Sequence, residues 1–165
     1  MNQSADSAPS GAGALLSRLA SIVGAANVLT EPADMAAHMK EPRDKYHGKS
    51  LGVVLPGDTQ EVSQVVRMAA EAGIAIVPQG GNTGLVGGQI PSEAGHELVI
   101  SLKRLNRIRA IDTSSNTMTV EAGCVLETVQ NAADDADRLF PLSLASEGSC
   151  TIGGNIAMNS GGAHC

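Results

Sequence analysis

Aromatic side chains are almost absent from this sequence, which has no tryptophan, one tyrosine (Tyr46) and one phenylalanine (Phe140). Proteins that bind single-stranded nucleic acids stack the bases on aromatic rings, so two isolated rings argue against such a surface. The core must be built from Val, Ile, Leu, Met and Ala instead. With 165 residues, 42% of them hydrophobic, the chain can bury a core of ordinary domain size.

Positive charge is also scarce. The chain has 11 Lys and Arg against 17 Asp and Glu, which gives a formal net charge of −6 at pH 7. Nucleic-acid surfaces need clustered Lys and Arg, so we expect no nucleic-acid partner. A small acidic metabolite is still allowed, because the charge inside a pocket can oppose the net charge.

Cysteine is too sparse for a disulfide framework or a zinc site. Cys124, Cys150 and Cys165 are odd in number, far apart and without a Cys-x-x-Cys pair. We expect no metal site, and thiols that are buried or incidental in a reducing compartment.

Long apolar runs and targeting signals are missing as well. No run approaches the roughly 18 apolar residues that a membrane span needs. Residues 1–13 are rich in Ser, Ala and Gly and lack the basic head and apolar stretch of a signal peptide. We therefore expect a disordered tail over residues 1–13, no membrane span and a cytoplasmic location.

The apolar residues that are present predict mixed helix and strand. An N-terminal helical segment is expected over residues 14–45, with one helix over 14–24 and a short one over 32–39. Strands over 51–55 and 74–77 flank a helix that Asp58 or Thr59 can cap. Its inward face is expected to carry Val62, Val65, Val66 and Ala69. This is a βαβ unit, whose two strands should run parallel.

The second half of the chain predicts a different pattern. A third strand is expected over residues 98–102, followed by a hairpin that pairs 107–111 with 117–121. A helix is expected over 125–136, and another could begin within 152–158. No internal repeat is present.

A glycine-rich loop follows the second strand of the βαβ unit. Five of the nine residues from Gly80 to Gly88 are glycine. Glycine admits positive φ and close approach of a ligand, and successive N–H groups can converge on an anion such as a pyrophosphate. The loop matches neither the Gly-x-Gly-x-x-Gly fingerprint nor the phosphate loop that ends in Gly-Lys-Ser/Thr. From spacing alone, a flexible surface loop is an equally open interpretation.

A second glycine-rich cluster favours a binding site over a flexible loop. It spans residues 147–155 and is followed by Asn159-Ser160-Gly161-Gly162. Two such segments separated by ordered elements suggest two walls around one ligand. A helix that starts near Ile152 could direct N–H groups at that ligand.

Catalytic groups are poorly represented. The histidines, His38, His47, His96 and His164, match no carboxylate or nucleophile spacing, so we expect each to face solvent. Ser146 and Ser149 lack a Gly-x-Ser-x-Gly elbow. We assign no acid, base or nucleophile, and therefore no catalytic residue, within this chain.

These motifs, taken in order, resemble a known family. The segments that carry the resemblance are residues 53–56, 77–88, 119–126, 140–142 and 148–155. They are similar to the FAD-binding domain shared by vanillyl-alcohol oxidase and p-cresol methylhydroxylase. Within that group they most resemble FAD-linked D-2-hydroxyacid dehydrogenases, which act on D-2-hydroxyglutarate, D-lactate or glycolate. The resemblance covers residues 46–165, the N-terminal part of such a domain.

The resemblance implies an α+β FAD-binding fold of two subdomains, one with a parallel βαβ unit and one with a partial antiparallel sheet. The pyrophosphate of FAD would lie on Gly80 to Gly84, and residues 141–154 would line the flavin and its ribityl chain. The implied cofactor-binding residues are Gly80, Gly81, Asn82, Thr83, Gly84, Leu85, Pro141, Leu142, Gly148, Ser149, Thr151, Gly153, Gly154, Asn155 and Asn159. Replacing Gly81 with Val is expected to abolish FAD binding and largely preserve the fold.

The implied activity is oxidation of a D-2-hydroxyacid by hydride transfer to flavin N5, with a hydroxyacid and an electron acceptor as partners and a homo-oligomer allowed. Many relatives that attach FAD covalently have His where this chain has Asn82, so the resemblance implies non-covalent FAD. Similar proteins continue well beyond Cys165, so this chain alone is expected to be inactive. The alternatives are the same domain in another FAD oxidase or reductase, and a non-catalytic nucleotide-binding module.

Overall fold

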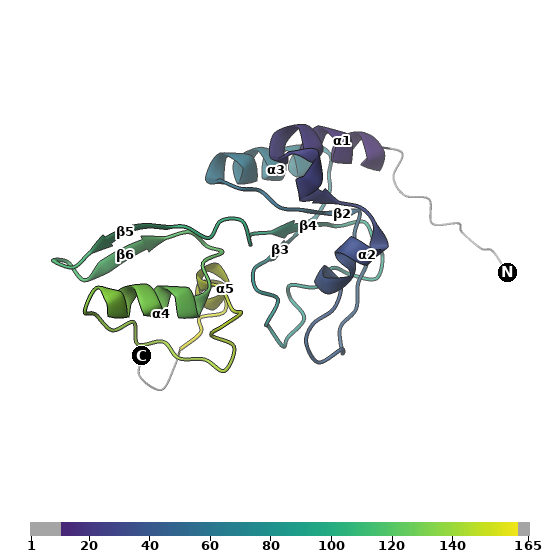
Figure 1. The fold of residues 1–165 in the computed structure, drawn as a ribbon. Coiled ribbons are helices and arrows are strands. Elements are labelled where there is room, and N and C mark those ends of the chain that lie inside the picture. The colour runs from purple at the N-terminus through teal and green to yellow at the C-terminus, as the bar shows by residue number, and fades with distance from the viewer. Residues whose placement is uncertain (1–10, 162–165) are drawn as a thin grey trace.

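The computed structural model describes residues 11–161, which fold into two parts (Figure 1). The first part is a four-stranded sheet with helices on its faces, and the second is a two-stranded hairpin with two helices beside it. Residues 1–10 of the expected tail, His164 and Cys165 lie outside the described residues. Within the described part, no helix has the length and apolar character to cross a bilayer.

The elements follow the order that the sequence predicts, with small shifts at their ends. The helices are α1 (Ala12–Val23), α2 (Pro32–Met35), α3 (Thr59–Glu71), α4 (Leu126–Asp135) and α5 (Ile152–Ala157), with 3-10 turns η1 (Ala25–Asn27) and η2 (Ala36–His38). The strands are β1 (Val28–Leu29), β2 (Gly52–Val54), β3 (Ile76–Gln79), β4 (Leu98–Ser101), β5 (Ile108–Asp112) and β6 (Thr117–Val120). Helix α1 begins two residues inside the segment that we expected to be a disordered tail.

Helix α3 begins and ends at the predicted signals. The Asp58 carboxylate accepts a hydrogen bond from the N–H of Glu61 (2.8 Å), and the Glu61 carboxylate accepts one from the N–H of Gly57 (2.7 Å). The first bond satisfies an N–H group of the first helical turn, and the second fixes the residue before the cap. Val65 and Ala69 are buried as predicted, but Val66 is 42% exposed, so its placement on the inward face was wrong. The rest of the protein covers only a narrow stripe along α3, centred on Val65 and Ala69. Successive residues of a helix are rotated by about 100°, so Val66 points away from this stripe and toward solvent.

The sheet has the order β1-β2-β4-β3. Strands β2 and β3 each pair in parallel with β4, so the predicted parallel direction of the βαβ strands is confirmed, although β4 lies between them. All four residues of β4 are buried, which suits the centre of a sheet that is covered on both faces. The short strand β1, which the sequence did not predict, pairs antiparallel with β2.

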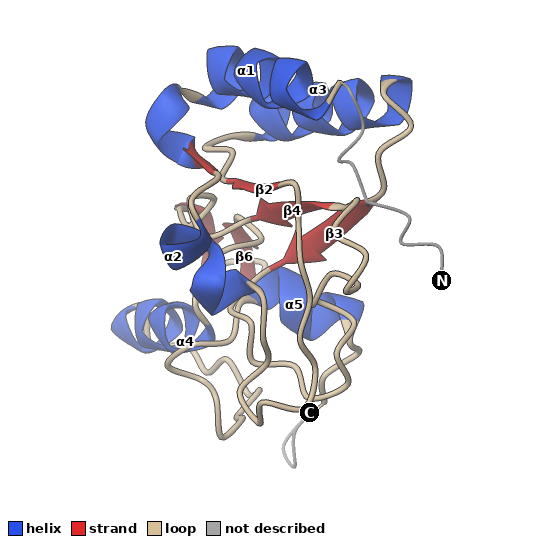
Figure 2. Cartoon of the chain, turned by 90° about the vertical axis from the view of Figure 1, so that its right-hand side faces the viewer, coloured by secondary structure: helices blue, strands red, loops and turns tan. Residues whose placement is uncertain are grey.

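Aliphatic side chains fill both faces of this sheet. One face packs under α1 and α3, which lie side by side above it (Figure 2). The side chains buried between these two helices and the sheet are Leu15, Leu19, Val23, Val54, Val65, Ala69, Leu98 and Ile100. The other face carries Val53, Val77 and Val99, with Met35 and Met39 packed against it from α2 and the end of η2. The core is aliphatic throughout, as the shortage of aromatic residues predicts.

The second part is smaller and less covered. Strands β5 and β6 pair antiparallel as predicted, and α4 lies beside them (Figure 1). One buried cluster of this part consists of Leu126, Leu142 and Cys150. Large apolar side chains remain exposed around them, including Leu139 at 85% and Ile156 at 75%. An apolar surface of this kind is typical of a face that packs against further structure.

The two parts meet at a close backbone crossing around Gly123. The N–H of Gly123 donates to the carbonyl oxygen of Leu105 (2.7 Å). A Cβ atom added to Gly123 would lie 2.0 Å from the carbonyl oxygen of Leu102 and 2.7 Å from that of Leu105. Only glycine permits this approach, which fixes the second part against the end of β4.

We predict that Gly123→Ala destabilises the protein, because backbone on both sides of the crossing would have to move to admit the methyl group. The expected loss is about 1–3 kcal/mol in the free energy of unfolding, the usual cost of forcing atoms into a well-packed site. Urea denaturation would measure it. Gly13→Ala is the matched control, since no atom lies within 4 Å of its added Cβ. Within α1 this exchange should be neutral or stabilising by about 0.5–1 kcal/mol. Equal stability of the two variants would contradict the crossing.

Candidate functional site

The candidate site lies where the parallel strands end. Gln79 is the last residue of β3, Ser101 is the last of β4, and the two are paired neighbours in the sheet. The loop over Gly80–Gly88, called the glycine loop below, leaves the sheet at this edge. Ligands of open α/β sheets bind at the carboxyl ends of the strands, so the topology supports the location that the sequence predicts.

The structure brings the two glycine-rich segments into direct contact. A Cβ atom added to Gly80 would lie 2.3 Å from Oγ1 of Thr151, and one added to Gly81 would lie 2.0 Å from the carbonyl oxygen of Ser149. The absence of side chains therefore serves loop-to-loop packing. A valine at residue 81 would strike Ser149 backbone, which argues against the expectation that Gly81→Val largely preserves the fold. Within the glycine loop, positive φ is found at Gly87 (80°), as expected of a glycine, and also at Asn82 (57°).

Hydrogen-bonding groups without partners gather around this contact. No hydrogen bond among residues 11–161 uses the backbone N–H groups of residues 81–88 of the glycine loop as donors. Four buried side-chain atoms also lack partners within the described part, namely Asn82 Oδ1, Ser101 Oγ, Thr151 Oγ1 and Asn155 Nδ2. Buried polar atoms are nearly always paired, so such a group marks a place where a ligand or water is expected.

Three of those four atoms belong to residues that the sequence nominated: Asn82, Thr151 and Asn155. The segment before α5 is held by backbone bonds, because the N–H of Ile152 donates to Cys124 (2.9 Å) and that of Gly153 to Ala122 (2.8 Å). Because of these bonds and the glycine contacts, backbone atoms form most of the walls of the site, and these atoms are polar. Such a site suits a cofactor with a phosphate chain, and the residues present fit one.

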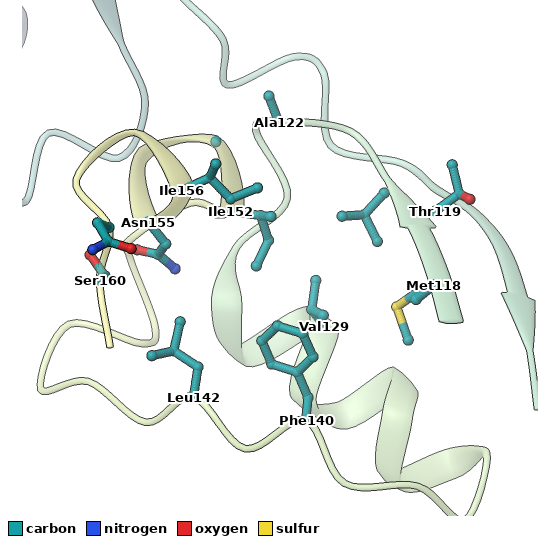
Figure 3. A pocket seen from close by; sticks show the side chains of 13 residues that line it. Met118, Thr119, Ala122, Val129, Phe140, Leu142, Ile152, Asn155, Ile156 and Ser160 are labelled. Atoms are coloured by element: carbon teal, nitrogen blue, oxygen red, sulfur yellow. The ribbon is translucent and has the colours of Figure 1, made fainter. Parts of the chain in front are cut away.

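A second group of expected residues lines a neighbouring cavity of about 730 Å³ (Figure 3). Leu142, Gly153, Asn155 and Asn159 line it, whereas Pro141, Gly148 and the glycine loop do not. Figure 3 shows that the other walls are mainly hydrocarbon, contributed by side chains such as Met118, Val129 and Phe140. The polar groups of Asn155 and Ser160 lie together at one end. The expected site residues are thus divided between a polar contact of two loops and an apolar cavity beside α5.

Several residues that shape the site were missed by sequence reasoning. His38 is only 6% exposed and contacts Gln79, so its expected solvent-facing position was wrong. Burial lowers the pKa of His38, with nearby Lys103 adding to the effect and the Gln79 hydrogen bond opposing it. No signal in the sequence identified His38, because its partner is 41 residues away. His47 and His96 are exposed, as expected.

Glu121 is the second residue that sequence reasoning missed. Its side chain is fully buried and receives hydrogen bonds from Arg107, through the backbone N–H (2.9 Å) and through Nη2 (2.8 Å), and from Arg109 Nη2 (3.0 Å). The Arg107 side chain is the main cause that lowers the pKa of Glu121 to about 2. Glu121 directly precedes Ala122, whose carbonyl holds Gly153 (2.8 Å). Its ion pairs therefore fix the strand end that supports the second glycine-rich segment.

Most of the chain matches the model of a known protein family. Residues 50–165 match the family model described as FAD binding domain. The chain is 44% identical over 140 residues to D-2-hydroxyglutarate dehydrogenase of Xanthomonas citri pv. viticola, covering 85% of this chain and 29% of that protein. It is 39% identical over 141 residues to the mitochondrial D-2-hydroxyglutarate dehydrogenase of Arabidopsis thaliana, covering 86% and 25%. The chain thus spans about a quarter to three tenths of these relatives' length.

Solved structures show the same fold at low sequence identity. Alkyldihydroxyacetonephosphate synthase superposes with a TM-score of 0.84 at 20% identity, over 94% of this chain and 33% of that one. p-Cresol methylhydroxylase superposes with a TM-score of 0.70 at 22% identity, over 93% and 30%. These likenesses confirm the α+β fold.

The Glu121 ion pairs should make stability depend on pH. The folded pKa is lowered from 4.5 to about 2, so the pairs contribute fully above about pH 4.5 and are lost as the pH falls toward 2. We expect Glu121→Gln to lower the melting temperature at neutral pH. The difference from the unmodified protein should shrink between about pH 4.5 and 2. Melting curves across this range would show it, and a difference that stays constant would contradict the assignment.

Proposed function

The chain belongs to the FAD-binding-domain family, and on this premise we propose that it is the FAD-binding portion of a dehydrogenase that oxidises a D-2-hydroxyacid to the 2-oxoacid. The identity of 44% to a D-2-hydroxyglutarate dehydrogenase supports that substrate class. Because the chain spans 29% of that relative, the activity is proposed for the whole protein.

The observation that carries the proposal is the contact of two glycine-rich segments at the carboxyl edge of the sheet. We propose that the backbone N–H groups of Gly80 to Gly84, including that of Asn82, and the Thr83 hydroxyl bind the pyrophosphate of FAD. Leu85 would border that site. The segment from Pro141 to Gly154 would line the flavin and ribityl chain, with Asn155 and Asn159 beside it. The unpaired atoms Thr151 Oγ1 and Asn155 Nδ2 would then gain partners.

The contribution of this chain is to bind and orient. When bound, the flavin supplies the acceptor for the hydride that leaves the α-carbon of the hydroxyacid. The packed main chain around Gly80 and Gly81 would fix the position of the cofactor. The aliphatic core of the sheet would in turn keep the ends of the strands rigid. We propose that the groups that bind substrate carboxylate lie in the part of the protein that this chain does not span.

We also propose that the FAD is held without a covalent bond. Asn82 occupies the position at which covalently linked relatives are expected to carry His, and an amide cannot form that link. Its Nδ2 donates to the carbonyl oxygens of Ala37 (3.0 Å) and Lys40 (2.8 Å). A cytoplasmic location also remains a proposal, since the Arabidopsis relative is named mitochondrial.

The proposed activity predicts stereospecific reduction of the cofactor. Mixing the whole flavin-loaded protein with D-2-hydroxyglutarate under anaerobic conditions should bleach the visible absorption of the flavin. The L enantiomer is the control and should leave the absorption unchanged. D-Lactate and glycolate, tested in parallel, would rank the hydroxyacids. If none of these compounds bleaches the flavin, the hydroxyacid proposal is wrong even where FAD is present.

The proposed mode of attachment predicts that acid denaturation releases all flavin. Precipitating the whole protein with acid should leave a colourless pellet and a yellow supernatant, because no bond joins FAD to Asn82. Absorbance of the two fractions measures the outcome. Flavin that stays with the washed pellet would show a covalent link elsewhere.

A further inference from the structure

We propose that residues 36–46, which precede the part of the chain matched by the family model, hold the glycine loop in its cofactor-binding shape, with His38 as a positioning residue. This inference rests on the proposed binding of FAD at the glycine loop. It adds a segment outside residues 50–165 to the site. Below, residues 36–46 are called the bracing segment.

The bracing segment contacts the glycine loop at points spread along its length. At the start of the loop, the amide Nε2 of Gln79 donates to the carbonyl oxygen of His38 (3.0 Å). Next, Asn82 Nδ2 donates to the carbonyl oxygens of Ala37 (3.0 Å) and Lys40 (2.8 Å).

Two further contacts reach the tip and the far end of the loop. The guanidinium of Arg43 donates to the carbonyl oxygen of Leu85. A Cβ atom on Gly87 would lie 2.8 Å from the ring of Tyr46, so that ring packs against bare main chain. The bracing segment therefore contacts the loop from its beginning to its end, while the N–H groups of residues 81–88 are left without described partners.

The His38 side chain fixes Gln79, which organises the loop from below. Gln79 is 1% exposed, and its Nε2 also donates to the carbonyl oxygen of Gln89 (3.0 Å). Since both Nε2 bonds go to carbonyl oxygens, Oε1 must be the acceptor that faces His38. His38 therefore carries its proton on Nδ1 and donates to Oε1. Gln89 in turn donates to the carbonyl oxygen of Gly84 (2.7 Å), which closes the loop on itself.

The bracing segment is itself internally fixed. The buried carboxylate of Glu41 accepts hydrogen bonds from the N–H groups of Arg43 and Lys45, each at 2.7 Å. Burial by itself would raise the pKa of Glu41, but these backbone bonds outweigh it and lower that pKa. Met39 accepts a bond from the N–H of Gly48 (2.9 Å). A segment that is ordered by its own bonds can order the loop beside it.

Ordering the loop in advance removes a cost of binding. A loose loop would have to lose conformational freedom when it closes on FAD, which weakens the affinity. A buried hydrogen bond whose partner is removed costs about 1–3 kcal/mol, equivalent to about 5- to 150-fold in an equilibrium constant. Loss of the His38 donor should therefore weaken FAD binding about tenfold although His38 is not proposed to touch the cofactor.

A pair of substitutions at residue 38 tests this. His38→Leu removes the donor to Gln79 and keeps an apolar side chain of similar size. His38→Asn retains an amide N–H near the position of Nδ1. Gln64→Leu is the control, an exposed polar residue of α3 outside the bracing segment and the glycine loop. Fluorescence titration of each whole apoprotein would give the dissociation constant for FAD. Trypsin cleavage after Lys40, Arg43 and Lys45, measured without FAD, would report whether the bracing segment stays in place.

We expect His38→Leu to weaken FAD binding about tenfold and to speed the trypsin cleavage, with both effects largely reversed in His38→Asn and absent in Gln64→Leu. Unchanged affinity in a folded His38→Leu protein would overturn the proposal. So would weakened affinity without rescue by Asn. If the unmodified protein binds no FAD, the proposed function fails, and the trypsin rates alone decide whether the segment is anchored by His38.

Asn82→Gly is a second variant, chosen in case His38→Leu does not fold. Glycine accepts the φ of 57° at this position, so the loop keeps its backbone while it loses the bonds to Ala37 and Lys40. Weaker FAD binding together with faster trypsin cleavage would support the bracing segment. Weaker binding with unchanged cleavage would show that Asn82 contacts FAD directly, which would contradict its role as an anchor.

Discussion

The close approach of backbone to backbone at residues 122–124 is the constraint on which the arrangement of the site depends. Gly123 lies against the carbonyl groups of Leu102 and Leu105, beyond the end of β4. On either side of it, the carbonyls of Ala122 and Cys124 accept bonds from Gly153 and Ile152. One short segment thus attaches the hairpin part to the sheet and positions the start of α5. Glu121 secures it from the preceding residue through its ion pairs with Arg107 and Arg109.

The same constraint explains why glycine accumulates on both sides of the site. Gly80 and Gly81 pack against Thr151 and Ser149 with no room for a side chain. Main chain then provides the walls, and the proposed binding mode assigns the N–H groups of the glycine loop to the cofactor. A cofactor with a charged phosphate chain suits such walls, because backbone N–H groups bind anions without requiring a cationic surface. This resolves the apparent conflict between an acidic chain of net charge −6 and an anionic cofactor.

The two halves of the site differ in how completely they are built. The glycine loop is supported from the sheet below and, through Asn82 and Gln79, from residues 36–46. The cavity beside α5 has exposed apolar residues at its margin, such as Ile156. The chain spans 29% of a relative with 44% identity, and exposed apolar residues of this kind are typical of a face that packs against another surface. In the proposed binding mode, this chain therefore supplies more of the phosphate end of the site than of the flavin end.

Local patterns in the sequence were sufficient for the elements and for the family. The spacing of aliphatic residues predicted α1, α3 and the parallel strands, and Asp58 predicted a helix start. The glycine-rich motifs indicated an FAD-binding fold. These features depend on residues close together in the chain, so spacing and turn chemistry reveal them. The insertion of β4 between β2 and β3, the burial of His38 against Gln79 and the contact of Gly81 with Ser149 were decided only by the tertiary structure. Each joins segments far apart in sequence, and their meeting depends on how the whole chain packs.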